Sequence, residues 1–77
     1  MKDIKHYRDE AIRAKRQVDY IRRRMEGVKQ ALKGTSNEAV KKALNTEMNQ
    51  LKVSLTKENN KVKDCEYQID QIRRGHE

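Results

Sequence analysis

The sequence contains no proline, phenylalanine or tryptophan, and only three glycines and one cysteine among its 77 residues. Without proline, no position imposes a helix break. Apolar residues make up 34% of the chain and charged residues 40%, so a thick globular core is not expected. The composition instead predicts elongated helices, which need only a narrow apolar stripe.

Other absences exclude whole classes of protein. The single Cys65 has no partner for an intrachain disulfide, which favours a reducing compartment, and we expect the cytoplasm. No apolar run approaches the roughly 20 residues that span a bilayer, and the first residues lack the apolar core of a signal peptide, so no membrane contact is expected. Met1 and the polar carboxyl end favour a complete small protein over a coiled-coil segment of a longer one.

Residues that could support catalysis are scarce. The chain has no glycine-rich phosphate loop, and no base is evident beside Cys65. A cluster of His6, Cys65 and His76 is the one arrangement that suggests a metal, and zinc needs three or four rigidly held ligands. We interpret these residues as two solvated histidines and a small buried thiol. The sequence therefore predicts no enzyme activity, no cofactor and no metal site.

Apolar residues recur at alternating intervals of three and four in both halves of the chain. This is the heptad pattern of a coiled coil, in which positions a and d form the seam between helices. The seam positions of the first half are Ile4, Tyr7, Ala11, Ala14, Val18, Ile21, Met25, Val28 and Leu32. Those of the second half are Leu44, Met48, Leu51, Leu55, Glu58, Val62, Cys65, Ile69 and Ile72.

A short polar segment separates the two patterns. Gly34 suits the left-handed residue that ends a helix, and Thr35 with Glu38 has the spacing of a capping box. A stop signal followed by a start signal predicts an all-α fold, an antiparallel coiled-coil hairpin with its turn near Gly34–Asn37. We expect one domain over residues 1–77, with helices at about 3–33 and 36–74. The alternative is a single long helix that dimerises with a second chain.

Two registers of the hairpin are compatible with the pattern. If the numbers of facing residues sum to 76, Cys65 faces Ala11, and if they sum to 69, Cys65 faces Ile4. The second register suits a tighter turn but leaves Ile69 and Ile72 without partners. Exposing two isoleucines costs about 3–6 kcal/mol, whereas losing a helix cap costs about 1 kcal/mol. We therefore expect the sum of 76, unless a second chain covers the isoleucines.

Glu58 is the one charged residue in the seam. It could act as a specificity device that penalises wrong registers and partners. Alternatively, its side chain could reach Lys15, Arg22 or Lys61 at the border of the seam. We favour the second interpretation because it needs nothing special of the site.

The net charge of +7 is unevenly distributed. Residues 1–33 hold eleven Lys/Arg and five Asp/Glu (+6), and residues 34–77 hold eight and seven (+1). Basic residues of the first helix recur every three to four positions, around a tyrosine, with Lys15 and Arg22 beside them. We call this predicted partner-binding set the basic stripe: Arg13, Lys15, Arg16, Tyr20, Arg22, Arg23 and Arg24.

These features predict a small non-enzymatic interaction protein, such as a regulator, inhibitor or assembly factor. It would dock its basic first helix on an acidic protein surface or a larger complex. The alternative is a nucleic-acid-binding accessory protein that uses the same face, although Asp19 and Glu26 interrupt the positive charge. The stripe could also be a solvated face that serves only solubility.

Apolar residues outside the seam suggest self-association. These residues are Ile12, Tyr20, Val53 and Tyr67. A two-helix hairpin buries little apolar surface, and pairing into a four-helix bundle is a common remedy. We therefore expect a homodimer.

Overall fold

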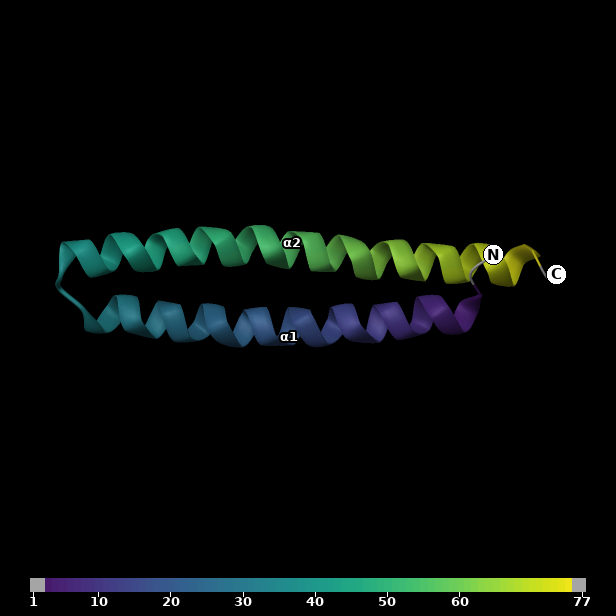
Figure 1. Ribbon diagram of the computed structural model, residues 1–77, viewed down its shortest axis with the longest axis horizontal. Coiled ribbons are helices and arrows are strands. Elements are labelled where there is room, and N and C mark those ends of the chain that lie inside the picture. Colours follow the sequence, from purple (N-terminus) through teal and green to yellow (C-terminus); the bar gives the residue numbers. More distant parts are fainter. Residues whose placement is uncertain (1–2, 76–77) are drawn as a thin grey trace.

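The computed structural model describes residues 3–75, which form two antiparallel α-helices (Figure 1). Helix α1 spans Ile4–Gly34 and helix α2 spans Glu38–Gly75. They pack along their length into a rod of 60 × 16 × 14 Å, and no strand occurs among the described residues. The predicted all-α antiparallel hairpin is confirmed.

Helix α1 begins with a capped first turn. The Asp3 side chain accepts a hydrogen bond from the His6 backbone N–H through Oδ1, at 3.0 Å. Asp3 has an extended backbone (φ −98°, ψ 178°), as expected for a residue just before a helix. Its negative charge also complements the positive end of the helix dipole.

The end of α1 differs from the sequence prediction. No glycine in residues 3–75 has a positive φ, so the prediction of a left-handed Gly34 is wrong. Gly34 is instead the last helical residue, and Thr35 leaves the helix in an extended conformation (φ −117°, ψ 141°). The chain turns through the three residues 35–37.

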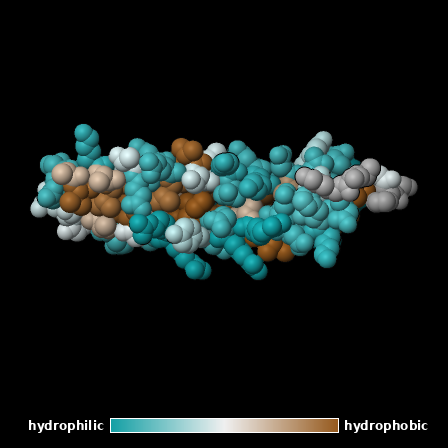
Figure 2. Space-filling model, in the orientation of Figure 1, coloured by the Kyte–Doolittle hydropathy of each residue, from teal (hydrophilic) through white to brown (hydrophobic). Residues whose placement is uncertain are grey.

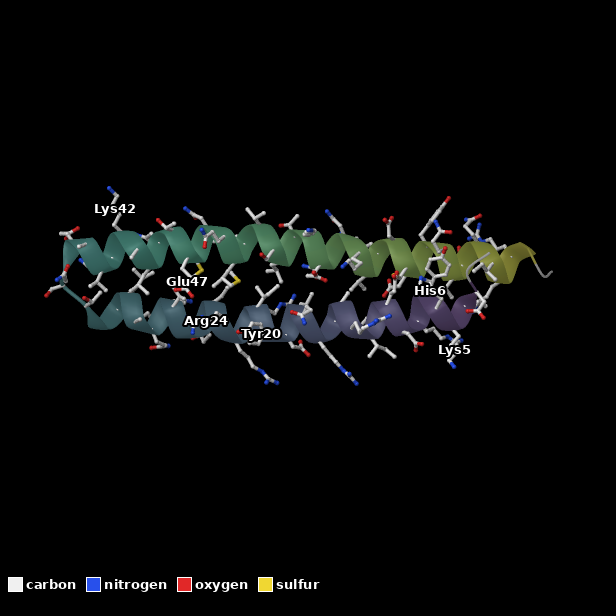
Figure 3. All side chains as sticks on the ribbon, in the orientation of Figure 1. Lys5, His6, Tyr20, Arg24, Lys42 and Glu47 are labelled. Atoms are coloured by element: carbon white, nitrogen blue, oxygen red, sulfur yellow. The ribbon has the colours of Figure 1, made fainter. Side chains whose placement is uncertain are left out.

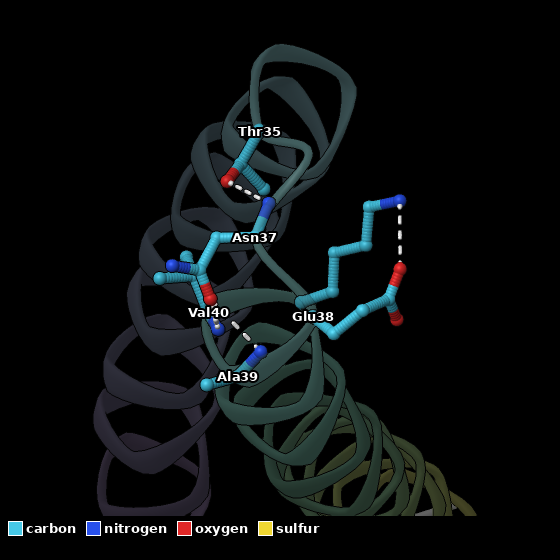
Figure 4. Close-up of polar contacts among 6 residues, drawn as sticks. Thr35, Asn37, Glu38, Ala39 and Val40 are labelled. Atoms are coloured by element: carbon cyan, nitrogen blue, oxygen red, sulfur yellow. Dashed lines mark hydrogen bonds and ion pairs between the residues drawn. The ribbon is translucent and has the colours of Figure 1, made fainter.

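The predicted capping box is also wrong, because Asn37 caps α2 (Figure 4). The Asn37 Oδ1 atom accepts hydrogen bonds from the backbone N–H groups of Ala39 (2.9 Å) and Val40 (3.2 Å). The Thr35 hydroxyl oxygen accepts from the Asn37 N–H at 3.2 Å, within the turn. Asn37 directly precedes the first helical residue, Glu38, so its short side chain is the one that reaches the free N–H groups.

The register follows from contacts across the seam. Cys65 Sγ lies 3.8 Å from Glu10 Oε2, and Glu10 directly precedes Ala11. This contact agrees with the sum of 76, which places Cys65 opposite Ala11, and not with the sum of 69. A short turn is compatible with this register because the first turn of α2 extends past the end of α1 (Figure 1).

Burial in the seam is unequal between the helices. The buried side chains are Ala11, Ala14, Val18, Ile21 and Val28 of α1 and Cys65 of α2. Other apolar seam residues of α2 are only half-buried: Leu44, Met48, Leu51, Leu55, Val62, Ile69 and Ile72. Figure 2 shows apolar side chains at the surface along the line between the helices, mainly in the half nearest the turn. The seam therefore leaves part of the apolar surface of α2 exposed.

Candidate partner-binding surface

All seven residues of the basic stripe are exposed on α1. Tyr20 is 64% exposed, and Arg16 and Arg23 lie one helical turn from it and Arg13 two turns from it. Four arginines of the basic stripe have no carboxylate of residues 3–75 within ion-pairing distance: Arg13, Arg16, Arg22 and Arg23. These four side chains are the charged members of the stripe that form no ion pair within the described hairpin.

Two members of the stripe pair with α2. Arg24 donates to Glu47 Oε1, with both Nε and Nη2 at 2.8 Å, and the two side chains meet between the helices (Figure 3). Lys15 Nζ lies 3.8 Å from Glu66 Oε1. The structure thus sets Arg24 apart from the neighbouring Arg22 and Arg23.

The two ion pairs mark two different edges of the seam. The d positions of the seam are Tyr7, Ala14, Ile21 and Val28 in α1, and Leu44, Leu51, Glu58, Cys65 and Ile72 in α2. The residues that directly follow them form what we call the basic edge: Arg8, Lys15, Arg22 and Lys29 of α1, and Asn45, Lys52, Asn59, Glu66 and Arg73 of α2. Residues that directly precede the a positions form the paired edge: Asp3, Glu10, Gln17, Arg24 and Ala31 of α1, and Glu47, Ser54, Lys61 and Gln68 of α2. Side chains at these positions flank the seam and set partner choice in coiled coils.

The two edges differ in the balance of their charges, although each has one ion pair between the helices. On the paired edge, the offset of the Arg24–Glu47 pair also places Glu10 opposite Lys61. The basic edge holds six cations and one carboxylate, that of Glu66. There, the offset of the Lys15–Glu66 pair places Lys29 opposite Lys52.

An open groove of about 660 Å³ lies on the basic edge. Its floor is the half-buried Met25, Met48 and Leu55, and its rim carries the exposed residues Arg22, Glu26, Lys29 and Lys52. We call this the methionine groove. The sequence analysis did not predict this groove. Every residue of α1 that follows a d position is basic, and this pattern could have indicated a basic edge.

A second, smaller groove of about 240 Å³ lies on the paired edge. It is lined by charges of both signs and neutral residues: Glu10, Arg13, Ala14, Gln17, Glu58 and Lys61. The Glu58 carboxylate lies 3.8 Å from Lys61 Nζ, with 18% of the Glu58 side chain exposed. The preferred interpretation of Glu58, a side chain that reaches a neighbouring lysine, is confirmed for Lys61.

Cys65 is held as a neutral, buried thiol. Burial raises the pKa of Cys65 above its ordinary value, and the negative charge of the neighbouring Glu10 carboxylate raises the pKa further. His6 Nε2 lies 3.3 Å from the other oxygen of Glu10, so one carboxylate contacts both side chains. A protonated thiol is a poor nucleophile and a poor metal ligand.

No group of three or more His, Cys, Asp or Glu side chains in residues 3–75 is arranged to hold a metal ion. His76, the third member of the cluster that the sequence suggested, lies outside the described residues. Over the same range, neither helix carries an apolar stretch long enough to cross a membrane. Comparison of the chain with models of protein families, with curated proteins and with solved structures gives no match.

Proposed function

We propose that this chain is a small non-enzymatic interaction protein that docks α1 on a larger, acidic protein partner. A regulator, an inhibitor or an assembly factor works in this way. The observation that carries the proposal is the set of four exposed arginines of the basic stripe for which residues 3–75 supply no carboxylate partner. Arginine and tyrosine are both enriched at protein interfaces, and Tyr20 stands exposed among these arginines.

An acidic protein fits this face better than nucleic acid does. Asp19 and Glu26 are exposed on α1 among the basic residues and would lie close to a phosphate backbone. Ile12 (49% exposed) and Tyr20 offer apolar area, which a protein surface can cover. Nucleic-acid binding by the same face is the competing outcome of the test.

Charge reversal within the stripe tests the proposal. An Arg16→Glu/Arg23→Glu variant should bind poly-L-glutamate, as a stand-in for an acidic protein, about tenfold or more weakly than the wild type, because two attractive contacts become repulsive. Fluorescence anisotropy measures the affinity, and circular dichroism checks that helicity is retained. A Lys57→Glu/Lys63→Glu variant is the matched control, since it removes the same charge from exposed positions of α2.

Equal loss in both variants would show that only net charge matters, and would contradict the proposal. Tighter binding to a DNA duplex would instead make nucleic acid the ligand. In that case log affinity should fall with log salt by about 0.9 per phosphate contact.

Self-association belongs to the same proposal. Ile12, Tyr20, Val53 and Tyr67 are 49%, 64%, 70% and 59% exposed, and two of them lie on each helix. The paired edge is the better surface for a second copy, because its charges are mixed while the basic edges of two copies would repel. Sedimentation equilibrium at micromolar concentration should give twice the mass of one chain, and a fully helical monomer would contradict the dimer.

A further inference from the structure

The basic edge carries an electrostatic conflict that the paired edge does not. Lys15 meets Glu66 across the seam, whereas the same offset two repeats towards the turn in each helix brings Lys29 opposite Lys52. Flanking positions of a coiled coil are stabilised by opposite charges and destabilised by like charges. A glutamate in place of Lys52 would give Lys29 a partner of opposite charge, so we expect the lysine to lower the stability of the isolated hairpin.

The methionine groove lies at this point of conflict. Met25, Met48 and Leu55 supply an apolar floor that α1 and α2 leave half-open. Arg22, Lys29 and Lys52 stand on the rim, with Glu26 as the one carboxylate there. An apolar centre inside a charged rim is the usual anatomy of a protein interface.

We infer that the methionine groove docks an acidic amphipathic helix of a protein partner. Apolar side chains from one face of that helix would lie on the floor, as in other helix-in-groove complexes, and the flexible methionines would adapt to them. Glutamates or aspartates beside that face would pair with the rim and relieve the repulsion between Lys29 and Lys52. The inference rests on the proposed function and deepens it, because it names the chemistry of the partner and the place where it binds.

The charge of the groove favours an acidic helix over a second copy of the chain. A second copy would present its own basic edge, with six cations and one carboxylate, to an identical surface. Two such edges repel each other, so this groove does not suit a symmetric dimer.

The probe for the test is a synthetic helix of about four turns with leucines at intervals of three and four and glutamates on either side. It should bind the full chain, and a peptide with lysine in place of each glutamate should not. Methyl NMR of methionine-labelled protein should show the signals of Met25 and Met48 shifting with the acidic peptide. Fluorescence anisotropy gives the affinities.

The decisive variant is Lys52→Glu. It should raise the midpoint of thermal unfolding, because Lys29 gains a partner of opposite charge, and it should weaken binding of the acidic peptide about tenfold. A Lys57→Glu variant is the control, since it makes the same charge change at an exposed position outside the groove. The control should lose much less affinity. A variant that is more stable and yet binds less tightly cannot be explained by damaged folding.

Several outcomes would overturn the inference. These are unchanged affinity in Lys52→Glu, equal binding of the lysine peptide, no binding of the acidic peptide to the wild type, or signals of Met25 and Met48 that shift with protein concentration alone. Loss of peptide binding in Arg16→Glu/Arg23→Glu, with full binding in Lys52→Glu, would refute the groove and leave the proposed function standing. The reverse result would support the groove and remove the outer arginines from the contact.

Discussion

Arg23 and Arg24 are adjacent in the chain but have different surroundings. Arg24 precedes a seam position and lies 2.8 Å from Glu47 of α2, whereas no carboxylate of residues 3–75 pairs with Arg23. The Arg24–Glu47 pair is partly exposed, so it contributes about 0–1 kcal/mol to stability. One arginine therefore belongs to the hairpin, and its neighbour is available to a partner.

Cys65 shows how a single residue can be predicted from its place in the repeat. The sequence places it at a seam position opposite the small Ala11, and both side chains are buried as expected. The contact with Glu10 could not be predicted, because Glu10 lies 55 positions away and the contact depends on the register. That carboxylate and the burial of the thiol together raise the pKa of Cys65, which keeps the thiol protonated at neutral pH.

At the scale of the elements, the sequence pattern predicted the position of the turn correctly, but it did not predict which residue caps α2. Thr35, Ser36 and Asn37 are all residues that cap helices, and the sequence does not say which one precedes the first helical residue. The capping box required a helix that starts two residues earlier than α2 does. The choice depends on how far α2 must extend past α1 to align the two seams.

Replacement of Asn37 by alanine tests the assignment of the cap. The Asn37→Ala variant should lose about 1 kcal/mol of folding stability, because two backbone N–H groups of α2 lose their acceptor. Thr35→Ala is the control and should cost less, since its hydroxyl accepts one hydrogen bond within the turn. Chemical denaturation measures both. A larger loss in Thr35→Ala would restore the predicted capping box.

At the scale of the whole molecule, the sequence predicts the hairpin because a seam needs only periodicity, which each helix carries by itself. To predict the difference between the two edges, the register must be known as well. Only the register shows that Lys29 faces another lysine while Lys15 faces Glu66. The prediction of the basic stripe did not use the register. It therefore grouped Arg24, which pairs with Glu47, with arginines that have no carboxylate partner in residues 3–75. The methionine groove was missed for the same reason, because its floor combines Met25 with Met48 and Leu55 of the other helix.

The register is therefore the central claim, since both edges and both grooves follow from it. Cys65 provides half of a disulfide, and an Ala11→Cys variant provides the other half in the register described here. A disulfide tolerates Cα separations of about 4.4–6.8 Å, and one heptad along a helix is about 10 Å, so only the facing pair can close within one chain.

Mild oxidation followed by denaturing electrophoresis and mass spectrometry decides the matter. Ala11→Cys should close within a single chain, and Ile4→Cys should not. Closure of Ile4→Cys alone would contradict the register and the two edges derived from it, and crosslinks formed only between chains would contradict the hairpin itself.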